Sequence, residues 1–343
     1  MKRSGREAIR AALQAEMKRD RSVFLLGPSV GLEGGREQTT SGLIHEFGPA
    51  RVMDLPLAPL ALLGAGLGAA YTGLRPVLEW PELESFAGSA LARAAGISHQ
   101  QWNAPAPLVV RASTAAGWGV MPQGWKVLLP SDPATAQGLL LAAIRDPNPV
   151  LFLETPALDA MLGEVPEAPT AMAPGRARVV RPGSDLSIFT GGAAVSVALE
   201  LAESLAGDGT EAEVVDLLSL EPLDEATIAG SLRKTSKGMI LYAPPAPGGL
   251  AGTAGGPAAG SGFFRSRCAD DSHPVGAAPA VGRDRAAAGL VLIQLSPTSR
   301  LGLLKRVHSW DDKYLRASHR APQGSGKVNI CRSMWSCRRW ASR

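Results

Sequence analysis

Along the first 250 residues, segments with apolar side chains at helical spacing alternate with short continuous apolar runs. Ile9, Leu13 and Met17 recur every fourth residue after Ser4, which predicts an amphipathic helix capped by Ser4. The uninterrupted apolar run at 23–27 is typical of a strand buried on both faces of a parallel sheet. After a glycine-rich loop, a short helix is expected from Ser41 to Gly48, followed by a strand within 50–56.

The same order of helix and strand recurs further along the chain. Asp132 at an N-cap and Pro133 at the first helical position predict a helix that leads into a strand over 149–154. After a proline-rich stretch, strands are predicted within 185–192, 212–218 and 238–244, and helices over 193–206 and from Asp224 onward. Alternation of this kind predicts an α/β fold with two parallel-sheet domains. We expect domains at 1–160 and 184–250, with 264 as the outer limit of the second, joined by a linker at 161–183.

One long stretch carries no charged side chain between Asp54 and Arg75. Its length suits a membrane span, but Pro56, Pro59 and many small residues argue against one. Its glycines are spaced G-x-G-x-G, unlike a dinucleotide-binding loop, and no strand leads directly into them. We therefore predict a glycine- and alanine-rich helix packed closely in the core.

Charge divides the chain into two unlike parts. Residues 1–264 hold 20 Lys and Arg against 26 Asp and Glu, whereas residues 265–343 hold 15 against 5. All three cysteines (Cys268, Cys331 and Cys337) lie in this basic tail, and their spacing is unlike that of a zinc site. The alternatives are a basic arm for an acidic partner or nucleic acid, and an irregular solvated tail; the absence of sustained periodicity favours the second.

Five segments resemble the β subunit of the thiamine-diphosphate-dependent 2-oxo acid dehydrogenases of the pyruvate and branched-chain type, which are relatives of transketolase. They are 6–27, 42–58 ("GLIHEFGPARVMDLPLA"), 64–79 ("GAGLGAAYTGLRPVLE"), 139–154 ("LLLAAIRDPNPVLFLE") and 212–235. The resemblance implies a pyrimidine-binding domain followed by a transketolase C-terminal-like domain. It also implies a heterotetramer with an α subunit, β–β contact and docking to a lipoyl acyltransferase core. In that assembly the chain contributes to oxidative decarboxylation and acyl transfer to lipoyl groups.

The resemblance ends near Gly249, where the charge also changes. This coincidence suggests a frameshifted or replaced C-terminus, a hypothesis that resequencing of the codons for residues 240–270 would decide.

The resemblance also implies site residues, and several of them differ here. Leu57 and Glu79 would bind the cofactor, although Glu79 has the alternative role of anchoring backbone near the pocket. The catalytic glutamate falls at Pro59, which cannot titrate, so no catalytic residue is predicted. Pro28 and Ser29 replace acidic residues, and the histidine loop is missing between Gly119 and Trp125.

Other side chains are poor substitutes for the missing groups. Glu82 and Glu84 are the carboxylates nearest in sequence after Glu79, whereas His45 and His99 are expected on the surface or in a loop. The segment 207–210 ("GDGT") resembles the start of a thiamine diphosphate–magnesium motif, but no Asn pair follows. Magnesium is therefore expected only through the α subunit.

One cation site matches the family pattern more closely. The backbone carbonyls of Ala143 and Ile144, with Asp146 and Asn148, suit a potassium ion at a helix end. The alternative is that the Asp-Pro-Asn-Pro sequence is only a helix stop.

Two functions remain open: a subunit of an active dehydrogenase, and an inactive homologue that acts in assembly or is an incomplete gene product. No signal sequence is recognisable, so a cytoplasmic protein that binds neither nucleic acid nor membrane is expected.

Overall fold

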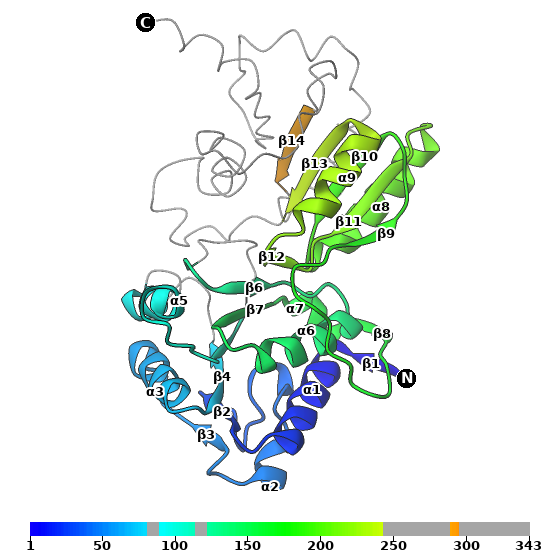
Figure 1. The fold of residues 1–343 in the computed structure, drawn as a ribbon. Helices are drawn as coiled ribbons and strands as arrows, with labels where there is room; N and C mark the ends of the chain where they lie inside the picture. Colours follow the sequence, from blue (N-terminus) through cyan, green and yellow to red (C-terminus); the bar gives the residue numbers. More distant parts are fainter. Residues whose placement is uncertain (81–88, 114–121, 243–288, 295–343) are drawn as a thin grey trace, which may run out of the picture.

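Residues 1–80, 89–113, 122–242 and 289–294 are described by the computed structural model. They form two α/β units stacked along the long axis of the molecule (Figure 1). The predicted fold class is confirmed, since both large sheets are built mainly from parallel strands.

The first unit is built on a seven-stranded sheet with the order β12-β6-β7-β5-β4-β2-β3. The strands in chain order are β2 (Val23–Gly27), β3 (Val52–Asp54), β4 (Arg75–Trp80), β5 (Val109–Ser113), β6 (Lys126–Leu128), β7 (Val150–Glu154) and β12 (Ser219–Glu221). All neighbours pair in parallel except β12, which runs antiparallel to β6.

Helices cover both faces of this sheet (Figure 1). One face packs against α1 (Gly5–Arg19) and α6 (Pro133–Arg145), and the other against α3 (Pro59–Tyr71) and α5 (Ala90–Trp102). Shorter elements are a 3-10 helix (Arg36–Gln38), α2 (Leu43–Phe47), α7 (Pro156–Ala160), and a two-stranded ribbon of β1 (Lys2–Ser4) and β8 (Leu162–Glu164). The sheet is thus buried on both sides, as its continuous apolar strands predict.

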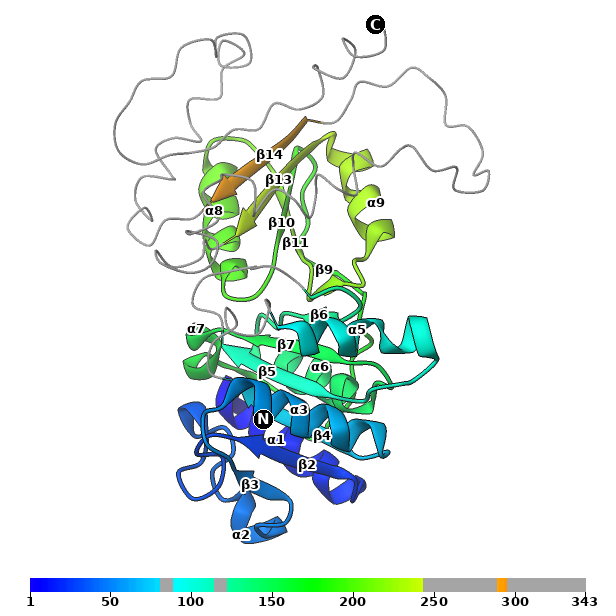
Figure 2. The same ribbon diagram turned by 90° about the vertical axis from the view of Figure 1, so that its left-hand side faces the viewer.

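The second unit has the strand order β14-β13-β10-β11-β9. Its strands are β9 (Arg178–Arg181), β10 (Leu186–Thr190), β11 (Ala212–Asp216), β13 (Lys237–Tyr242) and β14 (Gly289–Gln294). Figure 2 shows α8 (Ala194–Gly207) and α9 (Glu225–Thr235) on opposite faces of this sheet.

Three of the helix starts read from sequence are confirmed because capping is a local interaction, whereas α2 begins at Leu43 after the N-cap Gly42 and not at Ser41. Ser4 and Glu7 form a capping box at α1, and Asp132 and Thr135 form another at α6. The side chain of Asp224 accepts a hydrogen bond from the Thr227 backbone N–H at 3.0 Å and caps α9.

Four strands depart from the sequence expectation. β9 and β12 pair antiparallel at sheet edges, so the sheets are mixed rather than wholly parallel. β8 and β9 lie within 161–183, where only a linker was expected, and β14 lies in the tail that was expected to be irregular. Each of these strands gains its hydrogen bonds from a partner that is distant in sequence, which local periodicity does not reveal. The domain boundaries themselves stay predictions.

The uncharged stretch forms the predicted close-packed helix, α3. Leu62, Leu63 and Leu67 are buried, and a Cβ added to Gly66 would lie 2.7 Å from Leu78 Cδ1. In the part of the chain that the structure describes, no helix is long and apolar enough to cross a membrane.

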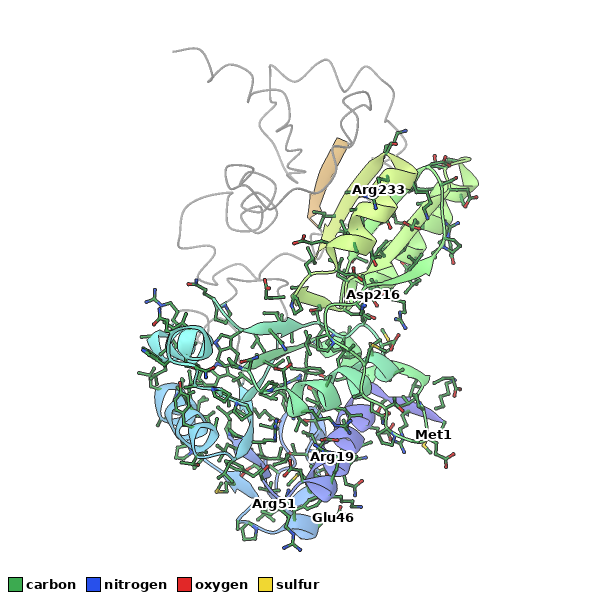
Figure 3. The ribbon with its side chains drawn as sticks, in the orientation of Figure 1. Met1, Arg19, Glu46, Arg51, Asp216 and Arg233 are labelled. Atoms are coloured by element: carbon green, nitrogen blue, oxygen red, sulfur yellow. The ribbon has the colours of Figure 1, made fainter. Side chains whose placement is uncertain are left out.

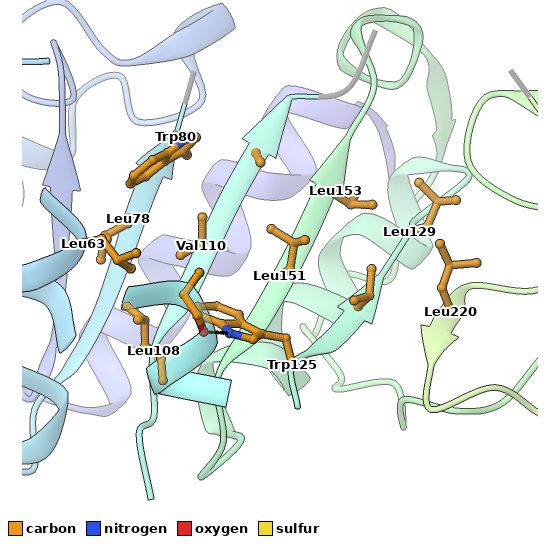
Figure 4. Packing of buried hydrophobic residues seen from close by; sticks show 14 of the residues in the cluster. Leu63, Leu78, Trp80, Leu108, Val110, Trp125, Leu129, Leu151, Leu153 and Leu220 are labelled. Carbon is orange, nitrogen blue, oxygen red and sulfur yellow. Dashed lines mark hydrogen bonds between the residues drawn. The ribbon is translucent and has the colours of Figure 1, made fainter. Parts of the chain in front are cut away.

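The core of the first unit continues into the second. Figure 4 shows residues of this shared cluster, from Leu63 and Trp80 to Leu129 and Leu220, side by side across the sheet. The Trp125 indole in this cluster donates a hydrogen bond to the Ala92 carbonyl oxygen at 2.6 Å. This continuous packing joins the β6–β12 edge of the first sheet to the second unit.

Candidate functional site

The carboxyl ends of β2, β4, β5 and β7 meet at one edge of the first sheet. Ligands of open α/β folds commonly bind outside this edge. Glu79, Arg111 and Glu154 lie near the ends of three neighbouring strands there, and each is buried. A charged group at each of these strand ends makes this edge the leading candidate region.

Five ionisable side chains meet at this edge, and we name them the buried ion cluster: Arg36, Glu79, Arg111, Glu154 and Asp159. Arg111 binds Glu154 through two bonds, Nε to Oε1 at 2.6 Å and Nη2 to Oε2 at 3.1 Å. Arg111 Nη1 also lies 3.3 Å from Glu79 Oε2. Arg36 bridges Glu154 and Asp159, with Nη1 2.7 Å from Asp159 Oδ2.

Three carboxylates in the buried ion cluster face only two guanidinium groups. Burial raises the pKa of Glu79, although the charge of Arg111 opposes the shift. Burial also raises the pKa of Asp159, with Arg36 acting in the opposite direction. The protonated forms of Glu79 and Asp159 are therefore favoured in this cluster.

Glu79 does not present its carboxylate toward an open pocket. Its Oε1 accepts a hydrogen bond from the Arg36 backbone N–H at 2.5 Å, and a Cβ on Gly35 would lie 2.8 Å from its Oε2. This geometry supports the alternative sequence interpretation, in which Glu79 anchors the backbone. Its assignment as a cofactor ligand stays a prediction.

The loop between β3 and α3 carries the other predicted cofactor residue. Leu57 is 62% exposed, and Pro56 and Ala58 beside it are also exposed. Pro59 occupies the first turn of α3, where its missing N–H costs no helical hydrogen bond. The position that the resemblance gives to a catalytic glutamate therefore starts a helix and holds no titratable group.

The predicted potassium ligands lie at the end of α6, where two cationic side chains, Arg75 and Lys126, already contact them. Arg75 Nη1 donates to the carbonyl oxygens of Ile144 at 2.8 Å and Asp146 at 3.1 Å. The Asp146 side chain pairs with Lys126 and accepts the Asn148 backbone N–H at 2.9 Å. The Ala143 carbonyl oxygen accepts the Asp146 N–H, so the potassium site stays a prediction.

The remaining candidates are placed only in part. His45 is exposed on α2, as predicted, and "GDGT" forms the turn between α8 and β11. His99 lies in α5, a helix that the sequence interpretation missed, and its side chain lies outside the described residues. Glu82, Glu84, residues 114–121 and the three cysteines also lie outside them. In residues 1–80, 89–113, 122–242 and 289–294, no group of three or more His, Cys, Asp or Glu side chains is arranged to hold a metal.

A second buried polar group lies where the two units meet (Figure 3). Ser131 Oγ donates to Asp216 Oδ2 at 2.5 Å, and Arg178 Nη2 lies 3.2 Å from the same oxygen. Arg178 also binds Asp132 Oδ2 at 2.7 Å. Burial raises the pKa of Asp216 to about 6, while the bonds from Ser131 and Arg178 oppose that shift.

Sequence reasoning missed most of both polar groups. The available signal was a charged residue near the end of each apolar strand run, at Glu79, Arg111 and Glu154. Because parallel strands end at a common edge, these residues could have been placed together. Arg36 carries no such signal, since its contacts depend on the path of a long loop.

Comparisons with known proteins agree with this architecture. Residues 1–158 match the model of the transketolase pyrimidine binding domain, and residues 175–254 match the transketolase C-terminal domain. The 2-oxoisovalerate dehydrogenase subunit beta of Bacillus subtilis is 39% identical over 255 residues, covering 68% of this chain and 77% of that protein. The pyruvate dehydrogenase E1 component subunit beta of the same organism is 38% identical, covering 71% of this chain and 81% of that protein.

A solved structure is also similar in fold. An inactive β4 tetramer of a split-gene transketolase has a TM-score of 0.61 at 20% identity and covers 88% of this chain and 93% of its own.

Proposed function

Since this chain belongs to the family of the β subunits of the pyruvate and branched-chain 2-oxo acid dehydrogenases, we propose that it serves as the β subunit of such an enzyme. The observation that carries the proposal is the ordered match of both domain models along a chain with two mainly parallel sheets. In this role it pairs with an α subunit in a heterotetramer and contacts a lipoyl acyltransferase core. Which 2-oxo acid is used depends on a pocket shared with the α subunit.

The cofactor implied by the family is thiamine diphosphate, which supplies the carbanion chemistry of decarboxylation. The exposed apolar loop at Leu57 fits one requirement, a non-polar contact for the aminopyrimidine ring. The buried ion cluster underlies this edge of the sheet and gives it a rigid base. The diphosphate and its magnesium ion would be held by the α subunit.

The chain does not fit the second requirement, a proton donor and acceptor beside the ring. Residue 59 is proline, and the Glu79 carboxylate is engaged by Arg36 and Arg111. We therefore assign this chain cofactor contact and assembly, and no proton-transfer step. This mismatch keeps the inactive homologue as the alternative.

We also propose that potassium binds at the end of α6, through the carbonyls of Ala143 and Ile144 with Asp146 and Asn148. Support comes from the Asn148 side-chain oxygen, which is buried without a hydrogen-bond partner within the described residues, and from the negative end of the α6 dipole. Thermal unfolding in potassium chloride and in tetramethylammonium chloride tests this site. Potassium should raise the unfolding temperature of the wild type but not of Asp146→Ala, and equal curves for the wild type in the two salts would refute it.

The functional proposal is tested by reconstitution with the α subunit encoded in the same genome. Thiamine diphosphate binding is measured by calorimetry, and decarboxylation is measured with pyruvate and with branched-chain 2-oxo acids. We expect cofactor binding with low turnover, and an increase on the order of 10²-fold in Pro59→Glu, because general acid–base catalysis typically contributes that much. Pro56→Glu, three residues away in the same loop, is the matched control.

The results of this reconstitution distinguish an active dehydrogenase subunit from an inactive homologue. Normal turnover by the wild type would exclude the inactive homologue. Assembly without cofactor binding would contradict the proposed cofactor site and favour a purely structural subunit.

A further inference from the structure

The loop from 28 to 42 lies over the carboxyl end of the first sheet and is fastened there by Arg36. The Arg36 backbone N–H binds Glu79, while its guanidinium reaches Asp159 at 2.7 Å and also Glu154. These partners come from β4, β7 and α7, so one residue ties the loop to three separate elements. Gly35 beside it has a φ of +68°, a left-handed conformation that suits glycine.

Hydrogen bonds within the loop link the segment that carries Arg36 to the segment that carries Gly31. The Gly35 N–H donates to the Ser29 carbonyl oxygen at 2.7 Å, and the Thr40 hydroxyl donates to the Val30 carbonyl oxygen at 2.7 Å. Thr40 is only 1% exposed, so its bond is shielded from water. A displacement of Arg36 would therefore move Gly31 with it.

Gly31 connects this loop to the loop between β3 and α3. Its N–H donates to Asp54 Oδ1 at 2.7 Å, and a Cβ on Gly31 would overlap the Asp54 carboxylate. The next residue, Leu55, donates its N–H to the Gly27 carbonyl oxygen at 3.0 Å. Leu57, the proposed cofactor contact, follows two residues later.

We propose that Arg36 is a positioning residue, which holds the 28–42 loop on the buried ion cluster and thereby fixes residues 54–58 for contact with the cofactor. Arg36 touches no proposed reacting group and acts through Gly31 and Asp54. The cofactor part of this inference rests on the proposed function, whereas the mechanical link between the two loops is independent of it.

The mechanical link is tested by amide hydrogen exchange of the full chain, followed by mass spectrometry. Arg36→Met removes the positive charge and the N–H donors of the guanidinium group but keeps a long side chain. We expect exchange on the order of tenfold faster in the peptides spanning 28–42 and 52–60, because local opening becomes easier. Arg36→Lys, which restores the charge, should recover part of the protection.

Arg19→Met is the matched control for general destabilisation. Arg19 also pairs with a buried carboxylate, Glu16, at 2.7 Å, but it lies at the end of α1 that leads into the start of β2, whereas both loops follow the ends of strands. If Arg36 had only a general stabilising role, Arg36→Met and Arg19→Met would both lower the unfolding temperature, and residues 52–60 would exchange at the same rate in the two variants. Unchanged exchange in 52–60, or an equal rise in Arg19→Met, would overturn the proposal.

The cofactor consequence is measured in the complex with the α subunit. Arg36→Met should weaken thiamine diphosphate binding on the order of tenfold, and Arg19→Met should leave it unchanged. An unchanged affinity in Arg36→Met would overturn the positioning role. If the wild-type complex binds no cofactor, the proposed function fails, and the exchange experiment still decides whether Arg36 fixes residues 54–58.

Discussion

Replacing Asp216 with asparagine should make the stability of the protein less dependent on pH. Asp216 is fully buried at the end of β11, where Ser131 and Arg178 bind one carboxylate oxygen. Its other oxygen has no hydrogen-bond partner within the described residues. Asparagine keeps an oxygen for Ser131 and Arg178 but carries no charge to be desolvated.

The magnitude follows from the pKa of Asp216, which burial raises from 3.8 to about 6 in the folded protein. A difference of roughly two units corresponds to about 3 kcal/mol at 1.36 kcal/mol per unit. Because the folded state binds the proton more tightly, the free energy of unfolding falls as pH rises from about 4 through about 6. Above that pH range Asp216 is ionised in the folded protein, and the free energy of unfolding is lowered by the full amount.

Urea unfolding of the full chain at pH 4, 5, 6, 7 and 8 measures this effect. Between pH 4 and pH 8, the free energy of unfolding of Asp216→Asn should rise relative to that of the wild type by up to about 3 kcal/mol, with most of the change below pH 7. Glu200→Gln, at an exposed position of α8, is the matched carboxylate-to-amide control. If the difference in unfolding free energy between Asp216→Asn and the wild type does not change with pH, or falls as pH rises, the pKa of Asp216 is not raised in the folded protein.

Two further predictions concern stability. Gly66→Ala places a Cβ 2.7 Å from Leu78 Cδ1 and should cost about 1–3 kcal/mol. Gly68→Ala in the same helix meets no atom within 4 Å and should be neutral or stabilise by up to about 1 kcal/mol, so equal shifts in melting temperature would contradict this packing. Asp132→Ala removes the α6 cap and one of the two carboxylate partners of Arg178, and should cost at least about 1 kcal/mol in urea unfolding. Asp132→Asn retains capping ability and should lose less; an equal loss would show that the ion pair, not the cap, stabilises the helix.

Local features of this fold were predictable because they depend on neighbouring residues. The caps at Ser4, Asp132 and Asp224 need only the next few residues, and each was found where expected. The continuous apolar runs of β2 and β7 likewise indicate burial on both faces without knowledge of the partner strand.

Features that depend on distant partners were not predictable. β12 follows the second unit's β11 in sequence yet pairs with β6 of the first sheet, so its pairing reflects the docking of the two units. Arg36 resembles an ordinary loop residue in sequence, and its role depends on Glu154 and Asp159, more than 100 positions away. Pro59 is the opposite case, because residue identity alone excludes proton transfer at that position.

We propose above that this chain is the cofactor-contacting β subunit of a 2-oxo acid dehydrogenase. The most direct test is calorimetric titration of thiamine diphosphate, with magnesium, into the purified complex of this chain and its α subunit. We expect a stable complex with saturable cofactor binding, and Arg36→Met should weaken that binding on the order of tenfold. A chain that forms no complex with the α subunit, or a complex that takes up no cofactor, would contradict it.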